Sequence, residues 1–237
     1  MLKQISIDSK DCKEEVLKYI IKYPILIQLP TVYGIIALPN SKGVHDLNKI
    51  KNRKSNKNYG SIVGDLNNFY ALFKKKKLPD FIQNINNLNV FNDCFIRGII
   101  SSTNKNNSVI KNGTHQGLIL KNKKLRDLIT AIEINLSYLN DIDLFDGNIY
   151  MAPLCTSANI SGDSKGSIIN KKDAILFAKE RDIKLMVTLK KEDIANELGS
   201  YPILSLNKHQ IDLVRNGPGD QKLLKLIPKE LRGLSFI

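Results

Sequence analysis

The sequence contains no tryptophan, and only three of its 237 residues are cysteine. Cys12, Cys94 and Cys155 lack the paired spacing of a zinc site, and an odd number cannot all pair in disulfides. No apolar run approaches the roughly 18 residues that a membrane span needs, and the polar N-terminus lacks the apolar core of a signal peptide. We therefore expect a reduced, soluble, cytoplasmic protein without a zinc site and without a membrane partner.

Several motifs of common enzyme classes are also missing. The sequence has no GxxxxGK[ST], no HExxH and no CxxC, so any nucleotide would bind without a P-loop. The three histidines, His45, His115 and His209, are scattered, and we expect them at the surface; only His115, in GTHQG, has the setting of a functional loop. Catalysis by a zinc ion or by a nucleophile–histidine pair is not indicated.

What the sequence has in excess is positive charge. It contains 36 Lys and Arg against 23 Asp and Glu, a formal net charge of +13. Such an excess attracts polyanions such as RNA or nucleotides. The chain is also rich in Lys, Asn and Ile throughout, as AT-rich genomes encode, so codon bias explains the excess equally well.

The hydrophobic pattern interleaves helices and strands without strict alternation, which favours a mixed α/β sheet over a doubly wound parallel one. Helices are predicted over residues 10–23, 43–50, 65–75, 124–138, 171–181 and 191–198. Strands are predicted over residues 25–29, 33–38, 61–63, 94–101, 116–120, 151–156, 185–188, 201–206 and 211–215, followed by a basic tail. No linker and no repeat interrupts the chain, so residues 1–237 are predicted to form a single domain.

Two stretches combine side chains that suit an anion. In extended backbone, Lys51 and Arg53 would point to the same side and present two cations to one polyphosphate. Ser157 and Asn159 would likewise share a face, near a glycine that lets a ligand approach. The alternatives are a solvated basic loop for the first stretch and a helix cap or turn for the second.

Two further stretches lie at predicted strand ends. Arg215 precedes the glycine turn Asn216–Gly219 and could reach a phosphate, or it could be an exposed base beside a turn. Thr31 and Tyr33 follow the buried strand 25–29 and would face one way, at the kind of position where ligands of α/β sheets bind. The alternative there is a strand connection with a packed tyrosine.

Taken in order, TVYGI (31–35), KNRKSNK (51–57), TSANISGD (156–163) and VRNGPGD (214–220) resemble the YrdC-like family of nucleotide- and RNA-binding proteins. The resemblance implies an α/β fold, a twisted open mixed sheet with flanking helices and a basic concave cavity. It also implies a threonylcarbamoyl-AMP synthase that uses L-threonine, bicarbonate, ATP and Mg²⁺ carried by the nucleotide, and that releases pyrophosphate. The product would serve threonylcarbamoyladenosine formation in tRNA, with tRNA and other tRNA-threonylcarbamoylation proteins as partners.

The resemblance also assigns roles to individual residues. Lys51 and Arg53 would hold the ATP phosphates and carry the catalysis. Ser157, Asn159 and Arg215 would bind the nucleotide, while Thr31, Tyr33 and Ser200 would form the threonine pocket. It implies no metal ligands from the protein itself.

The sequence departs from the family pattern near the expected substrate pocket. Gln28–Pro30 replaces the first PTD, Lys54 and Asn58 replace two prolines, Ile119 replaces an arginine, and SYPILS lacks an aspartate. These departures motivate two alternatives. The first is a non-catalytic protein that binds double-stranded RNA, tRNA or a nucleotide, and the second is an enzyme that acts on another amine.

Overall fold

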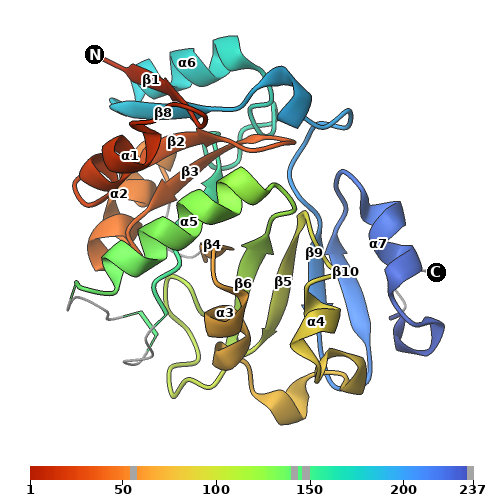
Figure 1. Ribbon diagram of the computed structural model, residues 1–237. Coiled ribbons are helices and arrows are strands. Elements are labelled where there is room, and N and C mark those ends of the chain that lie inside the picture. The colour runs from red at the N-terminus through yellow and green to blue at the C-terminus, as the bar shows by residue number, and fades with distance from the viewer. Residues whose placement is uncertain (54–57, 140–143, 146–149, 234–237) are drawn as a thin grey trace.

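The computed structural model describes residues 1–53, 58–139, 144–145 and 150–233. Within these ranges the strands form one ten-stranded mixed sheet in the order β1-β8-β2-β3-β7-β4-β6-β5-β9-β10 (Figure 1). The strands, in chain order, are β1 (Lys3–Ser6), β2 (Ile25–Gln28), β3 (Tyr33–Ala37), β4 (Gly60–Val63), β5 (Cys94–Ile99), β6 (Thr114–Ile119), β7 (Leu154–Ser157), β8 (Leu185–Thr188), β9 (Ile203–Leu206) and β10 (Ile211–Arg215). The predicted mixed sheet is confirmed.

The sheet is strongly twisted. In Figure 1, β1, β8, β2 and β3 run across the upper half of the molecule, whereas β6, β5, β9 and β10 run nearly upright in the lower half. Strand β7 joins the halves, because it pairs antiparallel with β3 on one side and with β4 on the other. The carboxyl end of β7 therefore lies at the centre of the twist, where residues from both halves meet.

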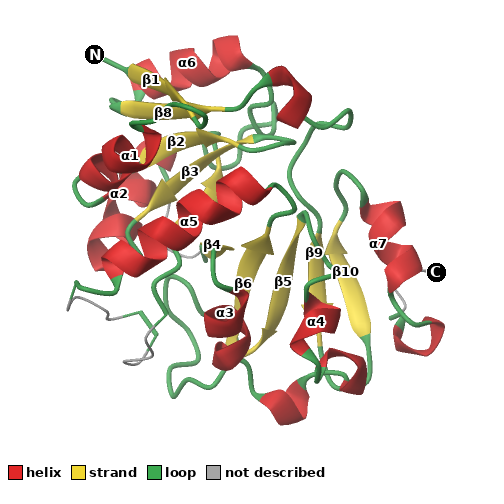
Figure 2. Cartoon of the chain, in the orientation of Figure 1, coloured by secondary structure: helices red, strands yellow, loops and turns green. Residues whose placement is uncertain are grey.

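Helices cover both faces of this sheet (Figure 2). The α-helices are α1 (Cys12–Ile20), α2 (Ser41–Lys51), α3 (Leu66–Leu72), α4 (Ile85–Leu88), α5 (Lys123–Leu136), α6 (Lys171–Glu180) and α7 (Asp220–Leu226). Short 3₁₀ turns span Lys75–Lys77, Asp80–Ile82, Lys191–Asp193 and Lys229–Leu231. Two clusters of buried apolar residues hold the layers together. Across the described ranges, no helix has the length and apolar character needed to cross a membrane.

Helix α5 shows how the sequence pattern becomes packing. Asn122 accepts a hydrogen bond from the backbone N–H of Leu125 (3.1 Å) and so caps the helix, whose apolar stripe is buried as predicted. Glu133 is buried too, and its carboxylate accepts the backbone N–H groups of Gly64 (2.7 Å) and Asp65 (2.8 Å). The backbones approach so closely that a Cβ at Gly64 would lie 2.5 Å from the N of Thr130, so only glycine fits there.

The helix predicted over 191–198 is wrong. Only Lys191–Asp193 forms a 3₁₀ turn, and the chain is extended at Ile194. The N–H groups of Ala195 and Gly199 instead bond the carbonyls of Pro30 (2.9 Å) and Thr31 (2.8 Å) in the β2–β3 connection. The bond from Ala195 takes a donor that a helix over 191–198 would need, and the bond from Gly199 holds the following residue against the same connection.

Other differences lie in segments with weak local signals. Strand β1 and helix α7 were not predicted, and α7 occupies what we expected to be a basic tail. His115 was expected at the surface, but it is 1% exposed in β6. Its Nε2 lies 2.9 Å from Ser61 Oγ and its Nδ1 lies 2.9 Å from the carbonyl of Val109, so both ring nitrogens have buried partners.

Candidate functional site

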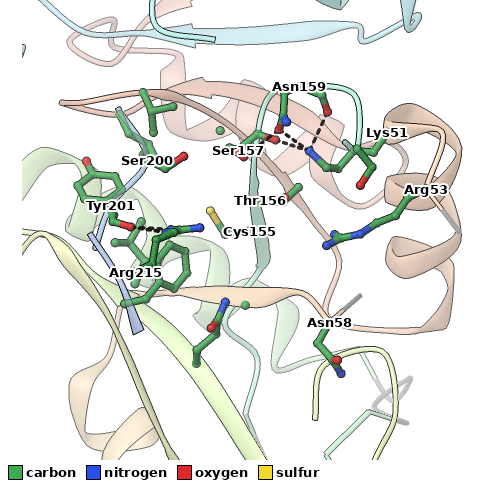
Figure 3. Close-up of a pocket in the computed structure, with 18 of the residues that line it drawn as sticks. Lys51, Arg53, Asn58, Cys155, Thr156, Ser157, Asn159, Ser200, Tyr201 and Arg215 are labelled. Carbon is green, nitrogen blue, oxygen red and sulfur yellow. Dashed lines mark hydrogen bonds between the residues drawn. The ribbon is translucent and has the colours of Figure 1, made fainter. Parts of the chain in front are cut away.

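A pocket of about 200 Å³ opens at the centre of the twist, and we call it the cationic pocket. Its wall joins residues that lie far apart in the sequence but close together in Figure 3. The predicted site residues among them are Lys51, Arg53, Ser157, Asn159, Ser200 and Arg215. Neighbouring strands form its floor through Gly60, Phe95, Gln116, Leu118 and Cys155.

We expected Lys51 to lie in extended backbone, but it is the last residue of the helix α2. Asn52 follows in the left-handed conformation (φ 47°) and ends the helix. Because the carboxyl end of a helix carries partial negative charge, a lysine at this place is stabilised. The Lys51 side chain is 3% exposed and turns toward β7 (Figure 3).

The Lys51 ammonium holds the Ser157–Asn159 segment in place. Its Nζ donates to the carbonyls of Ser157 (2.6 Å) and Asn159 (2.8 Å) and to Asn159 Oδ1 (2.9 Å). Ser157 Oγ also donates to Asn159 Oδ1 (2.9 Å), and Asn159 Nδ2 donates to the carbonyl of Ile160 (3.0 Å). Three N–H groups thus meet three protein acceptors. For Lys51 to hold a phosphate, as the resemblance implies, it would have to exchange one of these bonds, and that role stays a prediction.

Arg53 is placed differently. Its guanidinium stacks on the ring of Tyr59, with the central carbon 4.5 Å from the ring centroid, and Tyr59 is held by a hydrogen bond from its hydroxyl to Asn48 Oδ1 (2.8 Å). The side chain points into the cationic pocket (Figure 3). In the described part of the chain, Arg53 has no carboxylate partner, and its buried Nε has no hydrogen-bond partner. Arg53 is therefore available to an anion. Lys54 and the rest of 54–57 lie outside the described residues.

Arg215 enters the pocket from the end of β10, opposite Arg53. Its Nε and Nη2 donate to the carbonyl of Tyr201 (3.0 and 2.5 Å), which orients the guanidinium. The glycine turn after it is packed tightly, because a Cβ at Gly217 would lie 2.3 Å from the carbonyl oxygen of Ser200. Figure 3 shows Arg215 bonded to Tyr201 at the edge of the pocket.

The lining of the cationic pocket is electrostatically one-sided. Lys51, Arg53 and Arg215 line it, and among the described lining residues there is no Asp or Glu. Burial raises the pKa of the Cys155 thiol to about 12, although Lys51 and Arg215 oppose the shift, so the thiol stays protonated at neutral pH. The pocket can bind and orient a polyanion, but its floor offers no thiolate nucleophile.

Two of the predicted residues lie elsewhere. Thr31 and Tyr33 line a separate cavity of about 350 Å³, which shares only Leu29 and Val32 with the cationic pocket. Both side chains are buried, at 4% and 1% exposure. Ser200 does line the cationic pocket, and its Oγ lies 2.6 Å from Ser167 Oγ.

Arg97, on β5, is a basic residue of the site region that our sequence reasoning missed. Its Nε and Nη2 donate to Oε1 of Gln116 (3.2 and 2.6 Å), directly across from it on β6. Burial lowers the pKa of Arg215, and the nearby positive charge of Arg97 lowers it further. The available signal was a lone arginine inside the otherwise apolar strand CFIRGII.

Comparison of the sequence with known protein families finds no family model that matches, and comparison with curated proteins finds no match either. Comparison of the structure does find matches. P. abyssi Sua5, solved in complex with L-threonine, superposes with a TM-score of 0.71 at 15% identity over 98% of this chain. E. coli YciO superposes with a TM-score of 0.63 at 14% identity, over 94% of this chain and 98% of its own. Full-length HypF, solved with phosphate and nucleotide bound, gives 0.58 at 15% identity over 86% of this chain and 28% of its own.

These likenesses show the fold. The chain has the Sua5- and YciO-type α/β fold, as the resemblance to the YrdC-like family implied. It spans 62% to 65% of the length of the Sua5 chains.

Proposed function

We propose that the cationic pocket binds ATP and that the chain forms threonylcarbamoyl-AMP from L-threonine, bicarbonate and ATP, with release of pyrophosphate. The observation that carries this proposal is the meeting of separated sequence stretches, around Lys51, Ser157 and Arg215, at one pocket that has three cations and no described carboxylate. Such a lining suits a triphosphate, because each cation offsets part of the repulsion between the negative charges of neighbouring phosphate groups. The Sua5 complex with L-threonine and the nucleotide-bound HypF support the proposal.

The proposed reaction needs positioning more than strong acid–base catalysis. The threonine amine and bicarbonate condense to a carbamate with loss of water. A carbamate oxygen then attacks the α-phosphorus while the bond to the departing pyrophosphate breaks. Arg53 and Arg215 face each other across the pocket and would neutralise the charge that develops at the phosphorus and on the leaving group. Lys51 would keep Ser157 and Asn159 in the orientation that receives the nucleotide.

Mg²⁺ would enter this site with its nucleotide. The described lining offers no Asp or Glu as a ligand, and no group of three or more His, Cys, Asp or Glu side chains that could hold a metal ion occurs in the described residues. We therefore propose that the phosphates carry the ion and assign no protein ligand to it. The product would then serve threonylcarbamoyladenosine formation in tRNA, together with other proteins of that modification.

The test is a pyrophosphate-release assay with the purified chain, ATP, Mg²⁺ and labelled bicarbonate, with and without L-threonine. We expect release that requires threonine and label that enters an adenylate. Release without threonine, or no release while the folded protein binds ATP, would refute the synthase. Replacing threonine with a panel of other amines in the same assay distinguishes an enzyme with another amine substrate.

A specific observation favours a second candidate, a protein that binds a nucleotide or RNA without turning it over. Lys51, Ser157 and Asn159 bond one another, and Thr31 lies outside the cationic pocket. Residues assigned to catalysis, to nucleotide binding and to threonine binding are therefore engaged with the protein or placed in another cavity. Affinity for duplex RNA or tRNA would then fall steeply with added salt, since each neutralised phosphate releases counterions. Affinity that is insensitive to salt would exclude this candidate.

A further inference from the structure

A second basic cavity adjoins the cationic pocket, and we call it the Arg97 pocket. It has a volume of about 220 Å³ and adds Arg97, Lys111 and Thr114 to three residues that line both pockets, Arg53, Asn58 and Gln116. None of its described lining residues is an Asp or Glu. Two cavities thus share one wall, and Arg53 is the cation common to both.

The charges around the Arg97 pocket are unbalanced. Arg97 is half-buried, and burial lowers its pKa. It also lies close enough to Arg215 to lower the pKa of that guanidinium. In the described ranges, neither Arg97 nor Arg215 forms an ion pair with a carboxylate, so two partly desolvated cations repel each other with only neutral oxygens as partners. A bound anion would relieve this repulsion.

Gln116 gives the shared wall its polarity. Its Oε1 accepts two hydrogen bonds from Arg97, which turns the amide Nε2 away from that guanidinium. Asn58 lies on the same wall, anchored by a hydrogen bond from its Nδ2 to the carbonyl of Ile110 (2.7 Å). These are neutral groups between two cationic cavities, so one anionic chain can cross the wall without meeting a negative charge.

We propose that the Arg97 pocket is a second oxyanion subsite. It takes the terminal phosphates of the nucleoside triphosphate whose α-phosphate lies in the cationic pocket, and it retains inorganic pyrophosphate as a product. Arg53 contacts the phosphate chain between the two subsites. This assignment rests on the proposed function for its nucleotide, but binding of pyrophosphate alone tests the subsite separately.

The experiment measures the affinity of the full chain for pyrophosphate, ATP and AMP by titration calorimetry. We expect Arg97→Gln and Lys111→Gln to weaken pyrophosphate and ATP, Arg97→Gln by about tenfold or more, since each removes a charge-assisted contact. AMP affinity should change less than about twofold, because AMP lacks the terminal phosphates. Lys208→Gln, which removes the same charge from an exposed turn outside both pockets, should leave all three affinities unchanged.

The outcomes separate the two proposals. If the wild type binds pyrophosphate through Arg97 but binds neither ATP nor AMP, the subsite stands and the nucleotide function fails. If the variants weaken AMP as much as pyrophosphate, or leave pyrophosphate binding unchanged, the subsite is refuted. Loss of duplex RNA binding with unchanged pyrophosphate affinity would also refute it and would assign Arg97 and Lys111 to an RNA surface. Lys111 is exposed, so its variant remains informative if Arg97→Gln does not fold.

Discussion

Lys51 Nζ donates to Asn159 Oδ1 at 2.9 Å and to the Asn159 carbonyl at 2.8 Å, so a residue at the end of α2 fixes a segment 108 positions later. The same nitrogen donates to the carbonyl of Ser157, which is the last residue of β7. Because the ammonium is buried and hydrogen-bonded, it organises this wall of the cationic pocket from within the protein.

Lys51→Met should therefore lower both stability and ligand binding. The variant leaves the carbonyls of Ser157 and Asn159 without their donor, which we expect to cost about 2–3 kcal/mol of unfolding free energy. Denaturant unfolding measures this loss, and ATP affinity should fall with it. Lys49→Met is the matched control, since Lys49 is exposed in the last turn of the same helix. Equal stability of the two variants would contradict the role of Lys51 as a clamp.

Arg53→Gln should instead separate binding from stability. Its guanidinium has no carboxylate partner in the described residues, so removing it should change the unfolding free energy by less than about 1 kcal/mol. Losing a charge-assisted contact to phosphate should weaken ATP by roughly 10- to 100-fold. Arg181→Gln, at the end of α6, controls for net charge. Unchanged ATP affinity in Arg53→Gln would remove Arg53 from the site.

Glu133 predicts a pH dependence of stability. Burial raises its pKa from 4.5 to about 7, against the N–H groups of Gly64 and Asp65, which lower it. Between these values the folded chain holds a proton that the unfolded chain has released, so stability falls as pH rises from 4.5 to 7. The unfolding free energy of Glu133→Gln relative to wild type should rise by about 3 kcal/mol across that window.

The measurement is denaturant unfolding of both proteins at half-unit pH steps. Glu180→Gln, on the exposed face of α6, should run parallel to wild type. A constant difference between Glu133→Gln and wild type from pH 4.5 to 7 would show that Glu133 does not titrate in this window.

The burial of His115 leads us to expect a change of stability with pH of the opposite sign. Burial lowers its pKa from 6.5 to about 4, against the carbonyl of Val109, which raises it. As pH falls from 6.5 to 4, the unfolded chain binds a proton that the folded chain does not, so stability is lost. Relative to wild type, His115→Gln should gain about 3 kcal/mol as pH falls through that window. His45→Gln, at an exposed position, should show no such change in thermal or denaturant unfolding.

The predictable part of this fold lies where local pattern and burial agree. The stripe of α5 and the aliphatic run of β2 each specify one element, because alternative packing would expose their apolar side chains. The residues 191–198 show the limit. Their local pattern suits a helix, but the β2–β3 connection takes the backbone donor of Ala195. Such long-range competition cannot be read from a window of neighbouring residues.

The candidate site divides in the same way. Residue types alone left Lys51, Arg53, Ser157, Asn159 and Arg215 open between a polyanion site and ordinary loops or turns, and the resemblance to the YrdC-like family selected them. The structure places all five in the lining of one pocket. Only the tertiary structure determines which of these side chains remain available to a ligand. The twist of the sheet brings the ends of α2, β7 and β10 together, and the helical end of α2 turns Lys51 inward.

The sequence by itself determined the chemical character of this protein, a basic mixed α/β chain with cationic and small polar residues in a particular order. Only the tertiary structure decided that Lys51 is engaged within the wall while Arg53 faces the pocket, and that Thr31 lies in another cavity. It also brought Arg97 near enough to Arg215 for its charge to lower the pKa of that guanidinium. The physical reason is that charge and polarity belong to each residue, whereas hydrogen-bond partners and desolvation depend on which distant segments the fold brings into contact.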